Sequence, residues 1–262
     1  LATGQLPNGD KYTFEDRGTY KLESIPEEKC QDGVKCVFRN AICLSTGYPC
    51  RYGKVNVEAA LAVSSDAFFY KIGEQILTER GYAPVLEQEV RKFGLGSPTN
   101  IDLPYEYSGT IPSKELKKRL ANMGVITQEA GQAYYVGDQI LFAIGQGLLS
   151  VTPLQMTLAY SAIANSGRVY EPRVAVSLLA PGTLDARPGF ADFTTTQVVK
   201  NLAPISPKRR IDMTERIREP IVKGMARAIT GPGVTFDYYH KTTGENLFSN
   251  YNYAALPIAG KT

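Results

Sequence analysis

The sequence predicts a protein of the α/β class, more narrowly α+β, in which a mainly helical body lies between two strand-containing regions. Residues 1–55 combine short strand-like stretches with many Gly, Pro, charged and cysteine residues. From Asn56 onward, apolar residues recur at helical spacing, and the final apolar run reads as a strand. We therefore predict a cysteine-containing loop and strand region over 1–55, a mainly helical subdomain over 56–253 and a strand over 254–262.

Within the helical subdomain, several stretches place apolar residues on one face of an α-helix. These stretches are 56–64, 67–81, 84–93, 112–123, 152–165 and 214–229. The clearest start is Thr152, because Thr152 can cap the helix, Pro153 suits the first turn and Gln155 completes a capping box. Pro220 lies inside the last stretch and is expected to break or kink its first turns. Residues 169–179 read as strand or loop.

Composition and charge exclude several classes of protein. The chain has 262 residues, with 29 Lys and Arg against 26 Asp and Glu, a net charge of +3. So small an excess does not indicate nucleic-acid binding. No apolar stretch approaches the roughly 20 residues that a membrane-spanning helix needs. The sequence around Leu1 reads like the middle of a protein, and Thr262 stops inside the predicted strand, so we expect both ends to be cut.

The four cysteines form a local cluster at positions 30, 36, 43 and 50. Their spacing lacks the Cys-x-x-Cys pairs that are typical of structural zinc sites. An even number of cysteines in a segment rich in turn residues indicates two disulfides and an oxidising compartment. A four-thiolate zinc site and reduced thiols remain alternatives, and the pairing does not follow from the sequence.

Two short motifs carry functional side chains. Ser64-Ser65-Asp66 lies at the junction of two predicted helices, where a hydroxyl and a carboxylate can face a cleft; the alternative is that these residues only cap the second helix. Lys261-Thr262 follows the apolar run and offers a positive charge beside a hydroxyl, a combination that suits a carboxylate ligand. The lone histidine, His240, is expected at the surface and not in a Ser-His-Asp triad.

These motifs resemble one family. Penicillin-binding proteins and serine β-lactamases carry Ser-x-x-Lys, then Ser-x-Asn or Ser-x-Asp, then Lys-Thr-Gly, and the second and third elements match Ser64-Ser65-Asp66 and Lys261-Thr262. The run from Gly145-Gln146-Gly147 through Thr152-Pro-Leu-Gln155 resembles the class B (monofunctional) penicillin-binding proteins. The Asp at position 66, followed by Phe-Phe-Tyr, is similar to the penicillin-binding protein 2 type. The stretch 181–250 carries no motif of the family.

The resemblance implies the penicillin-binding protein/serine β-lactamase-like transpeptidase fold, and the chain would be mostly the helical subdomain plus part of the antiparallel sheet. It implies a peptidoglycan D,D-transpeptidase that works through an acyl-enzyme and binds β-lactams. Ser64, Asp66 and Lys261 would be catalytic: Ser64 would relay a proton, Asp66 would hold hydrogen bonds in the cleft, and Lys261 with Thr262 would bind the substrate carboxylate. Ser65 and Thr262 would contact substrate, and neither a cofactor nor a metal is implied.

The resemblance also implies partners and a location. Peptidoglycan stem peptides and β-lactam antibiotics would bind the site, and a glycosyltransferase of cell-wall elongation would be the protein partner, with no nucleic acid involved. The domain would lie on the extracytoplasmic face of the bacterial membrane, anchored by an N-terminal segment that precedes this sequence.

One departure from the family affects the expected activity. The 262 residues contain no Ser-x-x-Lys, so we expect the nucleophilic serine to lie shortly before Leu1 and the chain as it stands to be inactive. A non-catalytic scaffold or a β-lactam sensor is the alternative. A β-lactam hydrolase fits less well, because 197 positions (261 minus 64) separate Ser64 from Lys261, more than a compact β-lactamase allows.

Overall fold

A computed structural model describes residues 11–30, 36–41, 50–79, 84–180, 198–202, 206–230, 252, 255 and 258–261. Helices and short antiparallel strand pairs make up this part of the chain, which confirms the predicted class. The strands are β1 (Phe14–Asp16), β2 (Thr19–Lys21), β3 (Val37–Arg39), β4 (Gly53–Val55), β5 (Arg168–Tyr170), β6 (Ser177–Leu179), β7 (Val198–Asn201) and β8 (Pro207–Arg210). The helices are the 3-10 helix η2 (Glu27–Cys30), α1 (Val57–Val63), α2 (Asp66–Glu79), α3 (Val85–Lys92), α4 (Lys114–Asn122), α5 (Gln128–Gly131), α6 (Val136–Ala143), α7 (Pro153–Ala164) and α8 (Glu215–Thr230).

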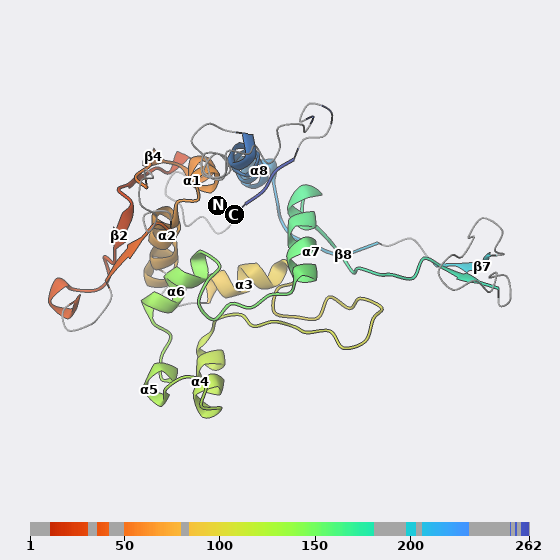
Figure 1. Cartoon of the computed structure of the whole chain (residues 1–262), viewed down its shortest axis with the longest axis horizontal. Helices are drawn as coiled ribbons and strands as arrows, with labels where there is room; N and C mark the ends of the chain where they lie inside the picture. Colours follow the sequence, from red (N-terminus) through yellow and green to blue (C-terminus); the bar gives the residue numbers. More distant parts are fainter. Residues whose placement is uncertain are drawn as a thin grey trace, which may run out of the picture.

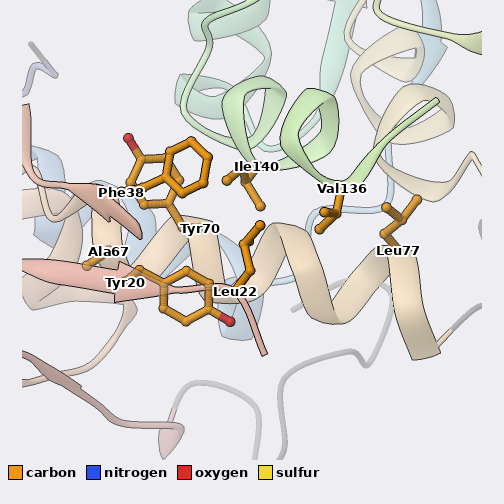
Figure 2. Packing of buried hydrophobic residues seen from close by; sticks show 8 residues of the cluster. All are labelled: Tyr20, Leu22, Phe38, Ala67, Tyr70, Leu77, Val136 and Ile140. Carbon is orange, nitrogen blue, oxygen red and sulfur yellow. The ribbon is translucent and has the colours of Figure 1, made fainter. Parts of the chain in front are cut away.

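Helix α2 packs against both α6 and the β2–β3 pair, and Figure 2 shows the apolar cluster that they share. The buried residues of this cluster are Tyr20, Leu22, Phe38, Ala67, Tyr70, Leu77, Val136 and Ile140. Full burial of one side chain of this size stabilises the fold by roughly 2 kcal/mol. Gly73 lets the two helices approach closely, since a Cβ at this position would lie 2.8 Å from the Cβ of Ala143.

The N-terminal strands pair with partners further along the chain. β1 pairs antiparallel with β4, and β2 pairs antiparallel with β3. Buried residues of β4, α1 and α2 form a second apolar cluster that includes Val55, Ala60 and Phe68. This packing places the end of β1, the end of β3 and the junction between α1 and α2 in one region of the molecule.

Helices α1 and α8 are far apart in the sequence but lie side by side (Figure 1). Gly224 on α8 permits this contact, because a Cβ there would lie 2.7 Å from the carbonyl oxygen of Glu58 and 2.8 Å from the Cβ of Leu61. Arg227 Nη1 also pairs with Glu58 Oε1 at 2.9 Å. A glycine at the crossing point therefore sets the distance between the two helices.

We expect Gly224→Ala to destabilise the protein by about 1–3 kcal/mol, the usual cost of adding a methyl group to a packed contact. Chemical denaturation followed by circular dichroism measures this change. Gly137→Ala is the matched control, since Gly137 also lies in a helix but has open space around its Cβ position. The control should fold at least as stably as the parent, because alanine favours helices over glycine by about 1 kcal/mol. Equal stability of the two variants would contradict the proposed close contact.

Helix α7 begins with the predicted capping box. Thr152 accepts a hydrogen bond from Gln155 N at 3.1 Å, and Gln155 Oε1 accepts one from Thr152 N at 2.9 Å. The buried Gln155 amide also donates to the carbonyl oxygens of Ser97 and Ser108, at 2.7 and 2.8 Å. One glutamine thus caps α7 and fixes the loop that precedes α4. The β5–β8 pair continues from α7, and the β6–β7 pair projects away from the helices (Figure 1).

The helices differ from the predicted segments in two places. α6 was not predicted; it buries Gln139 along with Val136, Ile140 and Phe142, so its buried face is not purely apolar. Pro220 was expected to break or kink the last helix, and the break does not occur, because α8 runs from Glu215 to Thr230 with Pro220 inside it. Pro220 is the sixth residue of α8, so its missing N–H leaves only one carbonyl of the first turn without a helical partner.

The C-terminal strand of the sequence analysis is only partly described. Residues 258–261 belong to no strand among the described residues. They run beside α8 instead, where Gly260 N donates to the carbonyl oxygen of Met225 at 3.1 Å.

Within the described parts, no helix is both long and apolar enough to span a membrane.

The cysteine cluster contains a disulfide between Cys30 and Cys36, with a Cα–Cα distance of 5.6 Å. Cys50 is disulfide-bonded as well, whereas Cys43 lies outside the described residues. The Cys30–Cys36 bridge ties the end of η2 to the start of β3, in a segment with few apolar residues. The predicted use of disulfides is therefore confirmed for this pair.

We expect no titratable thiol in the native, non-reduced protein, and mass spectrometry after reduction and alkylation should count two bridges. Closing a loop as short as that between Cys30 and Cys36 stabilises by about 2 kcal/mol on the chain-entropy model, so reduction should lower the midpoint of urea unfolding. Four alkylated cysteines without prior reduction, together with one bound zinc, would support the metal alternative instead.

Candidate active site

Ser64 occupies a strained turn at the end of α1. Its backbone lies in the left-handed region, with φ 56° and ψ 52°, a conformation that costs a residue other than glycine about 1–2 kcal/mol. The turn closes the helix, since Ser65 N donates to the carbonyl oxygen of Ala60 at 2.9 Å. At the other end of α1, Asn56 caps the helix by accepting from Ala59 N at 2.9 Å. The short α1 therefore ends by presenting Ser64 at the junction with α2.

The next helix starts immediately after this turn. Ser65 Oγ accepts a hydrogen bond from Phe68 N at 3.2 Å, and Asn40 Oδ1 accepts one from Ala67 N at 2.8 Å. Asp66 is the first residue of α2, and its Oδ2 accepts from Ala41 N at 2.7 Å. The capping alternative of the sequence analysis thus describes Ser65, while Ser64 points elsewhere.

Lys261 reaches Ser64 from the far end of the sequence. Its Nζ donates a hydrogen bond to Ser64 Oγ at 2.6 Å, across 197 positions. The route is visible in the packing: residues 258–261 run beside α8, and α8 packs on α1, which carries Ser64. The structure therefore brings together the two motifs that the sequence singled out.

Burial shifts the pKa values of Lys261 and Asp66 in the directions that favour their uncharged forms. Burial lowers the pKa of Lys261 below its usual value, and the attraction of Asp66 opposes that shift. Burial also raises the pKa of Asp66, assisted by repulsion from Asp16, whereas the Ala41 N–H and Lys261 act in the opposite direction. A lysine with a lowered pKa loses its proton more readily than a solvated lysine.

This geometry is suited to proton transfer. An ammonium that donates to a hydroxyl oxygen leaves the hydroxyl hydrogen free to point at a third group, such as the nitrogen of a substrate. The positive charge at Lys261 also suits a carboxylate. Among the described residues, no group of three or more His, Cys, Asp or Glu side chains could hold a metal ion.

One predicted contact is corrected. Ser65 was expected to bind substrate, but its side chain is 0% exposed and donates a hydrogen bond to the buried Asp16. A hydroxyl with no exposed surface has an internal role. Thr262 and His240 lie outside the described residues.

The residues that sequence reasoning missed are Asp16 and Asn40, which bind Ser65 and the start of α2. Each occurs alone in an irregular segment, and no motif marks it. Their only signal in the sequence was a polar side chain at the end of a short strand, which is common in loops.

The comparisons agree with the fold. The family model for the penicillin-binding protein transpeptidase domain matches residues 44–250, and the chain belongs to this family. Over 131 residues, half of this chain and 18% of the relative, it is 34% identical to the peptidoglycan D,D-transpeptidase MrdA of Escherichia coli K12. It is 28% identical to MrdA of Acinetobacter baumannii over 183 residues, which are 69% of this chain and 24% of that protein. The chain thus spans a quarter or less of these relatives.

Solved structures of penicillin-binding protein 2 share the fold. That of Pseudomonas aeruginosa, in complex with WCK 5153, superposes with a TM-score of 0.61 and 20% identity and covers 92% of this chain and 43% of the other. That of Helicobacter pylori, in complex with MreC, gives a TM-score of 0.57 and 22% identity and covers 90% and 34%. The relatives and the structures together place this chain with transpeptidase domains of the penicillin-binding protein 2 type.

Proposed function

We propose that this chain forms the greater part of a peptidoglycan D,D-transpeptidase domain that cross-links stem peptides through an acyl-enzyme and binds β-lactams. The observation that carries the proposal is the hydrogen bond from Lys261 Nζ to Ser64 Oγ at 2.6 Å. It joins the two family motifs of this chain in one site, within a domain that the family model matches over 44–250.

The reaction needs a serine nucleophile, which we place before Leu1 because no Ser-x-x-Lys occurs in the 262 residues. Its Oγ forms an ester with the penultimate D-alanine carbonyl, the amide C–N bond breaks, and D-alanine leaves. The amine of a neighbouring stem then attacks the ester, forms the new amide and releases the serine. Each half-reaction moves one proton to or from a nitrogen.

Ser64 is suited to carry that proton, with Lys261 as the group that exchanges it. The ammonium holds the Ser64 oxygen, so the Ser64 hydrogen can be directed at the departing nitrogen. Lys261 and Thr262 also offer a charge and a hydroxyl to the terminal carboxylate of the stem peptide. Asp66 supports the same site through its attraction to Lys261 and its hydrogen bond with Ala41 N.

We place the domain on the extracytoplasmic face of the bacterial membrane, anchored through a segment that precedes this sequence. The Cys30–Cys36 disulfide supports an oxidising compartment. For the protein partner, we propose a cell-wall elongation glycosyltransferase. Support comes from a similar structure that belongs to a peptidoglycan synthase complex coordinating polymerisation and cross-linking, with a TM-score of 0.56.

The deciding experiment uses the parent protein, including the residues before Leu1. A fluorescent penicillin should label it covalently, and mass spectrometry should place the adduct on a serine of a Ser-x-x-Lys preceding Leu1. Purified protein should also release D-alanine from a stem peptide that ends in D-Ala-D-Ala. Labelling without D-alanine release would favour a β-lactam sensor, and neither activity would favour a non-catalytic scaffold.

A further inference from the structure

A buried polar cluster lies next to the Ser64 turn, and the proposed chemistry does not use it. It consists of Asp16, Asn40 and Ser65, whose side chains are 1%, 0% and 0% exposed. The three residues come from separate places: the end of β1, the position after β3 and the junction of α1 with α2. Burial of a carboxylate costs free energy unless hydrogen bonds compensate for the lost water. The hydrogen bonds of Asp16 therefore indicate which parts of the structure the cluster holds together.

The Asp16 carboxylate joins all three places. Its Oδ1 accepts from Gly18 N at 2.6 Å, and both of its oxygens accept from Asn40 Nδ2 at 3.0 Å. Its Oδ2 also accepts from Ser65 Oγ. Asn40 Nδ2 donates in addition to the carbonyl oxygen of the disulfide-bonded Cys50 at 2.9 Å. Every polar atom of the three side chains therefore has a partner.

The same side chains also hold the beginning of α2. The first N–H groups of a helix have no partner within the helix, and here Asn40 Oδ1 binds Ala67 N while Ser65 Oγ binds Phe68 N. Ser65 is thus fixed by its own hydroxyl and by the helix that follows it. Ser64 lies between this fixed point and the last turn of α1.

We propose that the Asp16–Asn40–Ser65 cluster is the positioning device that holds Ser64 in its left-handed conformation within hydrogen-bond reach of Lys261. A strained residue keeps its conformation only where its surroundings over-determine it, and this cluster supplies that constraint on the side of α2. All three side chains are buried away from the surface, so we infer that they act through Ser64. The effect on catalysis rests on the proposed function, whereas the effect on the geometry of Ser64 and Lys261 does not.

Exchanging the two members of the Asp16–Asn40 pair tests this role. Asp16→Asn should break the pair, because two amide groups then face each other and one of them turns a donor toward a donor. Asn40→Asp should break it as well, because two carboxylates then share a buried site. The double variant Asp16→Asn/Asn40→Asp restores one carboxylate beside one amide with little change in volume. It leaves the carbonyl oxygen of Cys50 without the donor that Asn40 supplies, so it should recover the contact in part.

Acylation of the parent protein by a fluorescent penicillin gives the first measurement, with the binding constant and the rate constant for acylation determined separately. We expect each single variant to lower the acylation rate constant by about 10- to 100-fold, the scale for a small displacement of a catalytic group, with binding nearly unchanged. The double variant should regain at least tenfold over the poorer single variant. A loss in binding alone would overturn the proposal.

Glu74→Gln is the matched control. Glu74 is another buried carboxylate of α2 and accepts hydrogen bonds from Tyr20 Oη at 2.5 Å and from Ser24 N at 2.7 Å. Its loss should lower the unfolding midpoint about as much as Asp16→Asn does. Acylation by the folded control should stay near the parent rate, since its contacts do not include the Ser64 turn. If Glu74→Gln and Asp16→Asn slowed acylation equally, the cluster would contribute to general stability and not to the position of Ser64.

A second measurement on the 262-residue chain is independent of catalysis. The pKa of Lys261, followed by NMR of a 13C-methylated ε-amine, should lie below the usual value in the parent chain. Displacement of Ser64 removes the acceptor of the Lys261 ammonium, and loss of a hydrogen bond to the charged form lowers a lysine pKa. Asn40→Asp should therefore lower this pKa further, and the double variant should raise it again. A direct charge effect would act in the other direction, since an added carboxylate nearby raises a lysine pKa. If the parent protein never acylates, the proposed function fails and this titration alone decides the positioning role. An unchanged or raised pKa in folded Asn40→Asp overturns it.

Discussion

Replacing Ser64 with alanine in the parent protein should slow acylation by a fluorescent penicillin by roughly two to four orders of magnitude, the usual effect of removing a group that transfers a proton. The substitution removes the oxygen that accepts from Lys261 Nζ at 2.6 Å. Without it, no hydroxyl of the Ser64 turn remains to carry a proton, because Ser65 donates to the buried Asp16. Stopped-flow fluorescence under single-turnover conditions measures the rate constant directly.

The same substitution should leave the fold intact. Ser64 is only half-buried, and alanine tolerates the left-handed conformation about as poorly as serine does, so a loss of more than about 1 kcal/mol is not expected. Ser161→Ala is the matched control, since Ser161 is an exposed residue of α7 whose Oγ donates only to the carbonyl oxygen of Thr157. This control should acylate at the parent rate. Full-rate acylation by Ser64→Ala would remove Ser64 from the mechanism.

Replacing Lys261 with methionine should lower the second-order rate constant of acylation by roughly 100- to 1,000-fold, the scale for loss of one well-placed donor at a reacting centre. Both the partner of Ser64 and the charge available to a substrate carboxylate disappear. Methionine is unbranched and only one atom shorter than lysine and, since burial disfavours the charge of Lys261, should not destabilise the fold. Lys223→Met, on the exposed face of α8, is the matched control.

The pH profile of acylation separates these effects from general damage. Burial lowers the pKa of Lys261, so its ammonium is lost at a lower pH than that of a solvated lysine. If the ammonium is the active form, acylation should fall as pH rises through that lowered pKa. Lys261→Arg should shift this alkaline limb upward, because arginine stays protonated, and Lys261→Met should lack it. An alkaline limb that persists in Lys261→Met would have to come from another group.

Sequence reasoning was most successful where one local rule dominated. The Thr152 start of α7 follows from capping chemistry that involves Thr152, Pro153 and Gln155 only, and the structure contains that capping box. It was less successful for α6, whose buried face includes Gln139, since a polar residue at a core position interrupts the apolar stripe on which helix prediction depends. Pro220 was misjudged for a related reason: the rule against proline in a helix is weakest near the first turn, and packing of α8 on α1 favours the helix.

By itself, the sequence determined the class of the fold, the family and the two motifs that meet, because capping signals, helical periodicity and short functional motifs are local properties of the chain. Only the tertiary structure decided the hydrogen-bond partners of Ser64, Ser65 and Asp66. Ser64 faces Lys261, Ser65 turns inward to Asp16, and Asp66 binds Ala41 N. The directions of three adjacent side chains depend on the left-handed turn at Ser64 and on partners 25 to 197 positions away along the chain. Contacts at such separations form only when α1, α2, α8 and the N-terminal strands pack together. They cannot be predicted from the order of residue types along the chain.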